Sequence, residues 1–549
     1  MQCNRKVLGI LTAAILLLVA VAIALVLVLV VFREDVVKVK TPNAGTILGS
    51  TSILKDGDTK IQEFHNIRYA DPPVGMLRFR PPVRHFEEDP ENEVLATDST
   101  EIKCVQATSG EGAEDCLFLT VRSGDLNASK PVLVWIHGGG LSFGHGTSPG
   151  YSFDSEVTHK VDAVTVNINY RLGFLGFSSV KELWDEDEGV YANNGIRDMI
   201  AALDWIQDNI AAFGGDPGSV TLIGESGGAT AVLALTCSPL ANNKYHAVIS
   251  QSPAPEMRFT HVDGDVHQRT IVDQLDCTQE AAADRKQCLL ELPAEKFSGK
   301  YLDIMSGLGY FTFPLLLGEK AEVVGLVVID PVVVTVSPRN LSSGDFTPSS
   351  PLPIIVSNLA EENWQSDWEL NPPFTSKADL RTKLNPLFKN LSDEPNVTDE
   401  VIALYPNQDP VSIWSLMTCD MRSTCPTNSV AEAMSAAPHR DIYRLYITHR
   451  SSLGVPAFHG YDSIVFFGYK SEMFVARELD TKFEKHYIDM VKKLAKENTF
   501  EDGWMTFPGK SMIYENSDEI SKISSSKPQQ IVCEKLSELN LVKYGWQNK

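Results

Sequence analysis

The sequence predicts an α/β fold in which a large, mostly parallel central sheet is covered by helices on both faces. Helical stretches lie between several short apolar runs, and Gly195–Phe213 is the clearest, with apolar residues three or four positions apart. Strands that alternate with helices form parallel sheets, whose chemistry gathers at the carboxyl ends of the strands. The runs that we expect to be strands are Val132–Ile136, Ala163–Asn169, Val220–Ile223, Ala247–Ser250, Pro353–Val356 and Tyr443–Ile447.

Length and composition indicate a globular chain with a large core. The chain has 549 residues, of which 43% are hydrophobic and 22% charged. The formal net charge of -23 argues against nucleic acid or an anionic lipid surface as a partner, since both repel an acidic protein. We expect most of this charge to maintain solubility.

The first 45 residues differ from the rest of the chain. Val7–Phe32 is an apolar run without a charge, and its length suffices to cross a bilayer. A cleaved signal peptide has a shorter apolar core, so we expect an uncleaved signal anchor; cleavage would instead give a secreted protein. Residues 1–6 would form a short cytoplasmic end, residues 33–45 a stalk, and residues 46–549 one domain.

Cysteines and glycosylation motifs indicate an oxidising compartment. None of the nine cysteines forms a C-x-x-C pair, but Cys104/Cys116 and Cys277/Cys288 are spaced like small disulfide loops. The part of the chain after the anchor is therefore expected to be extracellular or luminal. Four N-x-[ST] motifs agree with this placement, at Asn127, Asn340, Asn390 and Asn396.

The segment 224–228 reads G-E-S-G-G and offers Ser226 as a nucleophile. A serine of this kind sits on a tight strand-to-helix turn, where flanking glycines avoid clashes. The context fits, because a strand-like run ends at Ile223 and a helix-forming run starts at Ala229. The alternative is an ordinary glycine-rich turn.

A serine hydroxyl needs a base, an acid and oxyanion donors. A glycine run follows the expected strand Val132–Ile136, at residues 138–140, and exposed backbone N–H groups there could bind an oxyanion. His459 lies in a turn-rich segment after the expected strand Tyr443–Ile447 and is a candidate base. The pattern alone does not separate Glu361 from Glu362 as the acid. The other histidines after Ser226 remain open as bases, namely His439, His449 and His486.

Four longer motifs carry a resemblance to a known family. From about residue 46 to the C-terminus the chain resembles the type B carboxylesterase/cholinesterase family of α/β-hydrolases. The resemblance implies the α/β-hydrolase fold and a serine carboxylesterase that acts on small-molecule esters without a metal or cofactor. The motifs are Phe64–Gly75, Glu114–Leu119, Asn169–Phe177 and Asn209–Pro217.

The resemblance also assigns individual residues. It implies a triad of Ser226, His459 and Glu362. It implies an oxyanion hole formed by Gly139, Gly140 and Gly227, with glycine at 227 where the family usually has alanine. It further implies the disulfides Cys104–Cys116, Cys277–Cys288 and Cys425–Cys533.

Two alternatives within the family remain. Cholinesterases carry a tryptophan between the cysteines that correspond to Cys104 and Cys116, which holds a quaternary ammonium by a cation–π contact. Here that loop is short and has no aromatic residue, which favours a general carboxylesterase. Other membrane-anchored members have lost the serine or histidine and act as adhesion or receptor ectodomains. The serine, the histidine and the glutamate are all present in this sequence, which favours an enzyme. A protein partner or a homodimer is also compatible with the sequence.

Overall fold

The structure is a computed structural model, and it places most of the chain after residue 35. The expected anchor, Val7–Phe32, and the expected glycosylation site Asn390 lie outside the described residues. The described residues are 36–87, 89, 91–255, 257–298, 327–343, 351–362, 375–389, 392, 394–449, 456–468, 478–498, 500, 504–514, 521–539 and 541–542.

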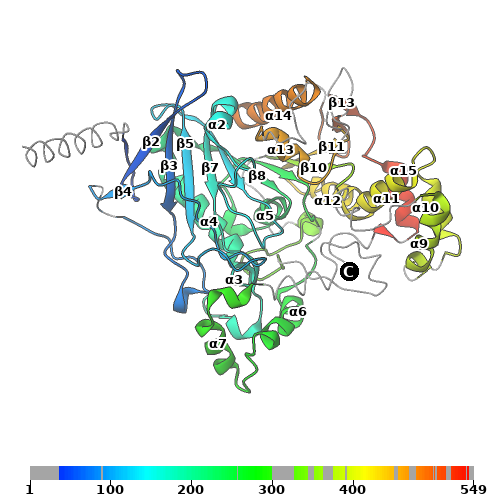
Figure 1. Ribbon diagram of the computed structural model, residues 1–549, viewed down its shortest axis with the longest axis horizontal. Coiled ribbons are helices and arrows are strands. Elements are labelled where there is room, and N and C mark those ends of the chain that lie inside the picture. The colour runs from blue at the N-terminus through cyan, green and yellow to red at the C-terminus, as the bar shows by residue number, and fades with distance from the viewer. Residues whose placement is uncertain are drawn as a thin grey trace, which may run out of the picture.

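In this part of the chain, thirteen strands form one mixed sheet in the order β1-β2-β3-β5-β7-β6-β8-β9-β10-β11-β12-β13, with β4 paired to β2 (Figure 1). The strands are β1 (Val37–Lys40), β2 (Thr46–Ile53), β3 (Lys60–Arg68), β4 (Glu93–Leu95), β5 (Phe118–Ser123), β6 (Lys130–Ile136), β7 (Val164–Ile168), β8 (Gly215–Glu225), β9 (Ala247–Gln251), β10 (Leu352–Leu359), β11 (Arg440–Ile447), β12 (Ser511–Tyr514) and β13 (Ser521–Ser524).

The centre of the sheet is parallel, as the sequence predicts. Each of the six expected runs falls on a strand, β6 to β11, and neighbouring strands from β7 to β12 in the sheet order pair in parallel. The two ends of the sheet are antiparallel, between β1 and β7 and between β12 and β13. The antiparallel strands were not predicted; β2 is half-exposed and alternates between buried and part-exposed residues, so it lacks the continuous apolar run of a central strand.

Helices cover both faces of the sheet. Figure 1 shows α2, α13 and α14 together at the top of the view and α3, α6 and α7 at the bottom. The helices are α2 (Ser155–Val161), α3 (Gly173–Phe177), α4 (Asn194–Asn209), α5 (Gly227–Leu235), α6 (His261–Gln274), α7 (Ala282–Glu291), α9 (Lys377–Lys389), α10 (Val397–Ala403), α11 (Pro410–Cys419), α12 (Cys425–Ser435), α13 (Tyr461–Phe466), α14 (Glu478–Glu497) and α15 (Gln530–Glu538).

The alternation of side chains along β6 divides the core into two layers. Val132 and Val134 are fully buried with residues of α4 and α5 on one face. Leu133 and Trp135 are fully buried with residues of α2, α13 and α14 on the other face. The predicted helix Gly195–Phe213 is α4 followed by one turn of 3-10 helix. The sheet is thus fixed rigidly from both sides at the strands that carry the site.

The N-terminal edge begins earlier than the boundary that we expected at residue 46. Val37–Lys40, within the expected stalk, forms β1 and pairs antiparallel with β2. Val39 is buried in the main core, which explains why this short segment joins the sheet. Among the described residues no helix is long and apolar enough to cross a membrane.

All three disulfides implied by the resemblance are present: Cys104–Cys116, Cys277–Cys288 and Cys425–Cys533. The third joins the start of α12 to α15 across 108 residues of sequence. Cys237 and Cys419 are buried free thiols. Three of the expected glycosylation sites are exposed, namely Asn127, Asn340 and Asn396.

Candidate active site

Ser226 occupies a strained turn between β8 and α5. Its φ of 55° and ψ of -120° lie outside the regions that non-glycine residues favour. Its backbone N–H donates to the Gln251 carbonyl at 2.8 Å. A Cβ on Gly228 would lie 2.1 Å from the Ile136 carbonyl oxygen, so only glycine lets α5 pack this closely against β6. The turn is therefore built to hold the serine side chain above the sheet.

His459 lies between Ser226 and Glu362. Its Nε2 is 2.8 Å from Ser226 Oγ, and its Nδ1 is 2.6 Å from Glu362 Oε2. The second oxygen of Glu362 accepts a hydrogen bond from the Leu359 N–H at 2.8 Å. Glu362 follows β10 and His459 follows β11, so three neighbouring regions of the sheet edge supply the three side chains.

The other candidates lie elsewhere. Glu361 donates its N–H to the Ala457 carbonyl, and Glu362 is the neighbour that contacts the imidazole. His449 is fully buried and stacks on Phe483. His439 is exposed at the start of β11. Of the two glutamates that the sequence pattern left open, Glu362 is the one whose carboxylate lies 2.6 Å from His459 Nδ1.

Two further carboxylates lie near the imidazole. Oε1 of Glu225 is 3.3 Å from Nε2 of His459. Burial would lower the pKa of His459, but the charges of Glu225 and Glu362 outweigh it and raise this pKa to about 9. Asp462 is fully buried, where Gln251 Nε2 donates to its Oδ2 at 3.2 Å.

Burial raises the pKa of both Glu225 and Asp462 to about 7. Glu225, which contacts the imidazole, and Asp462 are therefore buried carboxylates with raised pKa values. We did not predict a role for Glu225 or for the Gln251–Asp462 pair from the sequence. Glu225 could have been found from its position beside Ser226, whereas nothing in the sequence indicates that Gln251 lies at the site.

The glycine run lies directly against the start of α5. Gly139 and Gly140 have positive φ angles of 98° and 58°. A Cβ on Gly139 would lie 2.1 Å from the Phe143 carbonyl oxygen, so the turn requires glycine there. A Cβ on Gly227 would lie 2.9 Å from the Gly140 nitrogen. The backbones of Gly140 and Gly227 are therefore neighbours, and a Cβ on Gly138 would lie 3.2 Å from Ser226 Cβ, so the glycine run lies beside the serine.

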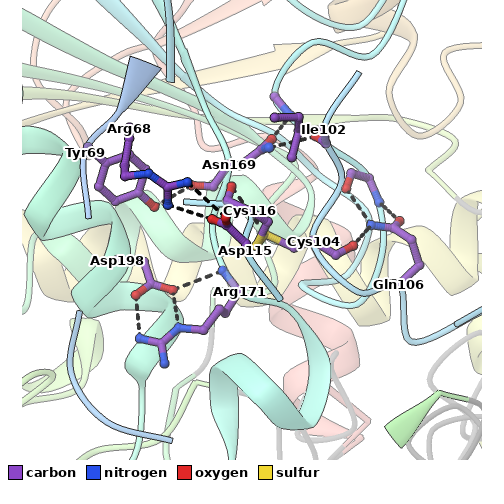
Figure 2. The surroundings of a disulfide bond; sticks show 12 residues. Arg68, Tyr69, Ile102, Cys104, Gln106, Asp115, Cys116, Asn169, Arg171 and Asp198 are labelled. Carbon is purple, nitrogen blue, oxygen red and sulfur yellow. Dashed lines mark hydrogen bonds and ion pairs between the residues drawn. A yellow bond between two sulfur atoms is a disulfide. The ribbon is translucent and has the colours of Figure 1, made fainter. Parts of the chain in front are cut away.

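The loop between Cys104 and Cys116 supports this turn. Gln106 Oε1 accepts from the Gly144 N–H at 2.7 Å, and Gln106 Nε2 donates to the Gly144 carbonyl at 3.0 Å. The same amide donates to the Cys104 carbonyl at 2.7 Å, which ties it to the disulfide (Figure 2). The Ala107 N–H donates to the Ser142 carbonyl at 2.8 Å. A covalently closed loop thus holds the glycine turn in place.

Ion pairs fix the surroundings of the same disulfide (Figure 2). Arg68 binds Asp115, the residue before Cys116, through two hydrogen bonds of 2.6 and 2.9 Å. Arg171 binds Asp198 through bonds of 2.8 and 2.6 Å, and both side chains are almost completely buried. The first pair joins the end of β3 to the loop before β5, and the second joins the segment that follows β7 to α4.

Comparison with known proteins agrees with this architecture. Residues 34–532 match the model of the Carboxylesterase family. Carboxylesterase 1D of Rattus norvegicus is 34% identical over 371 residues, which are 63% of this chain and 62% of that protein. Liver carboxylesterase of Sus scrofa is 33% identical over 400 residues, or 67% of each chain. Phenmedipham hydrolase of Pseudarthrobacter oxydans is 39% identical over 226 residues, 39% of this chain and 43% of that protein.

The chain belongs to the carboxylesterase family. The alignments span 62% and 58% of the length of two rat relatives, Carboxylesterase 1D and Liver carboxylesterase B-1.

Proposed function

We propose that this chain is a serine carboxylesterase that hydrolyses carboxylic esters through an acyl-enzyme intermediate. The observation that carries the proposal is the pair of hydrogen bonds that links Ser226 Oγ, the two nitrogens of His459 and Glu362 Oε2. A serine, a base and an acid in this order form the arrangement that activates a hydroxyl nucleophile.

In the first half-reaction, Ser226 Oγ attacks the ester carbonyl carbon while His459 Nε2 takes its proton. The carbon–oxygen bond to the alcohol then breaks, and His459 returns the proton to the leaving alkoxide. In the second half, His459 takes a proton from water, the hydroxide attacks the acyl carbon, and the carboxylic acid leaves as Ser226 regains its proton. Glu362 orients the imidazole and stabilises its charged form.

The negative oxygen of each tetrahedral intermediate would be stabilised by backbone N–H groups of Gly139, Gly140 and Gly227. Preorganised donors act strongly because they need no reorganisation as charge develops. The positive φ of Gly139 and Gly140 and the contact between Gly140 and Gly227 support this role.

The substrate class that we propose is small carboxylic esters without a quaternary ammonium group. The part of the Cys104–Cys116 loop that faces the glycine turn presents Gln106 and Ala107, neither of which can bind a cation through an aromatic face. Two of the relatives are named carboxylesterases, which agrees with carboxylic esters as substrates.

The direct test is hydrolysis of short-chain nitrophenyl esters by the full chain, with acetylthiocholine in parallel. Ser226→Ala and His459→Ala should each lower kcat by about 10⁴-fold or more. Glu361→Gln is a matched control for Glu362→Gln, since the two carboxyls are sequence neighbours and it is the Glu362 carboxylate that lies 2.6 Å from His459 Nδ1. Equal activity of Ser226→Ala and wild type would overturn the proposal.

We also propose that residues 7–32 anchor the chain in a membrane, with the domain extracellular or luminal. The disulfides and the exposed sites Asn127, Asn340 and Asn396 support this placement. Removal of N-glycans should lower the apparent mass of the cellular protein. If the domain is extracellular, external protease should digest it on intact cells. If the domain is luminal, protease should reach it only after the organelles are opened. An unglycosylated domain digested from the cytoplasmic side would contradict this topology.

A further inference from the structure

A fully buried arginine, Arg444 on β11, lies behind the loop that carries Glu362. Its exposed fraction is 0%, and all its hydrogen bonds reach uncharged oxygens. Nε donates to Asn428 Oδ1 at 2.9 Å, Nη1 to the Val356 and Leu445 carbonyls at 3.1 and 2.6 Å, and Nη2 to Asn358 Oδ1. In the described part of the chain no carboxylate forms an ion pair with it. A buried charge of this kind is costly unless another charge compensates it.

The strand register directs Arg444 toward the acid loop. Arg444 lies beside Val356 in the parallel pair β10/β11, and Asn358 is two positions further along the same face of β10. Figure 1 shows α12, which carries Asn428, next to these two strands. The guanidinium therefore sits between the sheet and α12, at the end of β10 from which the chain continues to Glu362.

Hydrogen bonds continue from the arginine to the carboxylate. Asn358, which binds Arg444 through Oδ1, donates through Nδ2 to the Leu359 carbonyl at 3.0 Å. The Leu359 N–H donates to Glu362 Oε1 at 2.8 Å. The thiol of Cys419 lies 3.2 Å from the Leu359 carbonyl as well. Arg444 thus bonds the last part of β10 directly, at Val356 and Asn358, and reaches the turn that presents Glu362 through Asn358 and Leu359.

Buried carboxylates are concentrated around the site that Arg444 supports. Glu225, Glu362 and Asp462 are 3%, 4% and 0% exposed, and Glu225 and Glu362 both contact the His459 imidazole. Burial lowers the pKa of Arg444 to about 9. The Coulomb interactions with Tyr446, Glu362 and Cys419 oppose burial and raise this pKa. Arg444 therefore remains mostly protonated at neutral pH, and Glu362 is the carboxylate whose charge it feels.

We propose that Arg444 is a positioning residue for the acid of the triad: it anchors the Leu359–Glu362 turn and supplies the buried countercharge of the Glu362 carboxylate. This inference rests on the proposed esterase function. It assigns to a side chain without substrate contact the task of holding the Glu362 carboxylate in line with His459.

The test compares kcat and KM for a nitrophenyl ester, with active sites counted by a covalent organophosphate. Arg444→Met should lower kcat about 10- to 100-fold, as expected for a misaligned catalytic group, and change KM less than twofold. Arg444→Lys should recover most of kcat because it keeps the charge. Arg440→Met is the matched control, since Arg440 is a buried arginine on the same face of β11 at its opposite end.

A second pair of variants separates charge from packing and covers the case in which Arg444→Met fails to fold. Asn428→Asp would neutralise Arg444 from the α12 side without touching the Glu362 turn, and it should lower kcat. Asn428→Ala removes the same side-chain hydrogen bonds without adding charge, and it should leave kcat within threefold of the wild type. The melting temperature of each variant reports on folding.

Unchanged kcat in Arg444→Met and in Asn428→Asp would overturn the inference while leaving the esterase intact. The inference would also be overturned if Arg440→Met lowered kcat as much as Arg444→Met, or if Asn428→Ala lowered kcat as much as Asn428→Asp. An inactive wild-type chain would instead overturn the proposed function, and the inference with it.

Discussion

Oε1 of Glu225 lies 3.3 Å from Nε2 of His459, the same nitrogen that lies 2.8 Å from Ser226 Oγ. A protonated imidazole can therefore be stabilised by Glu225 in addition to Glu362. Stabilising the imidazolium helps once the serine has lost its proton, but it also makes the resting base more basic than an ordinary histidine. The dependence of kcat/KM on pH should therefore change when Glu225 is replaced.

Glu225→Gln should move the pH profile to lower pH. The pKa of His459 is raised by its carboxylates, and only the neutral imidazole accepts the serine proton, so kcat/KM should rise with pH through a midpoint above 6.5 in the wild type. Removing one charge at 3.3 Å should lower that midpoint by about one unit or more. The measurement is kcat/KM against pH, and Glu186→Gln, an exposed carboxylate elsewhere, is the control. A midpoint that stays or rises would contradict this assignment.

Gly460→Ala should disable the base, because a Cβ there would lie 1.8 Å from Tyr151 Oη, beside His459. We expect kcat to fall about 100-fold, as for other misplacements near 1 Å. Gly57 is a close control: it has the same φ of 82°, and nothing lies within 4 Å of its Cβ position. Gly57→Ala should therefore show only the backbone strain, seen as a lower melting temperature with kcat unchanged. Similar kcat values for the two variants would refute the steric argument.

Gln106→Ala should weaken catalysis more than stability, because Gln106 holds both backbone groups of Gly144 next to the glycine turn. Loosening oxyanion donors should lower kcat about 10-fold, less than the loss of a whole donor. Gln207→Ala is the control, since Gln207 also donates to two backbone carbonyls, those of Pro217 and Lys244, on another part of the domain. Thermal melting and steady-state kinetics on both variants distinguish the roles. Equal kcat losses would show that the loop contact has no special part in catalysis.

Arg171→Met should destabilise the fold strongly, because it leaves the fully buried carboxylate of Asp198 without its bidentate partner. Breaking a buried pair from one side costs about 3–5 kcal/mol in free energy of unfolding. Lys485→Ala removes one member of an exposed i,i+4 pair on α14, and chemical denaturation should detect no change. A small effect of Arg171→Met would show that the pair is not needed for stability.

Much of the fold was predictable because its central strands are buried on both faces. β6 contains the continuous apolar run Val132–Ile136, β9 begins Ala-Val-Ile, and glycine turns mark the ends of β6 and β8. The antiparallel edges were not predicted, since β1 and β13 are only four residues long and carry mixed side chains. Val37–Lys40 joins the sheet through pairing with β2, a long-range contact that local pattern does not encode.

The candidate site was predictable where its residues lie close together in the sequence and form a local motif. Ser226 and the glycine run are local motifs, and the resemblance selected Glu362 and His459 from several alternatives. Glu225 was overlooked although it precedes Ser226, because the motif leaves that position open. Gln251, Asp462 and Arg444 act through contacts made by distant strands and helices, and a single sequence does not show such contacts.

The most direct measurement is the site and stoichiometry of covalent labelling by a fluorophosphonate, read by mass spectrometry alongside the burst of nitrophenol from a nitrophenyl ester. We expect one label per chain on Ser226, a burst equal to the labelled fraction, and much slower labelling in Glu362→Gln and His459→Ala. Ester hydrolysis that continues after complete labelling, or a label on a residue other than Ser226, would contradict it.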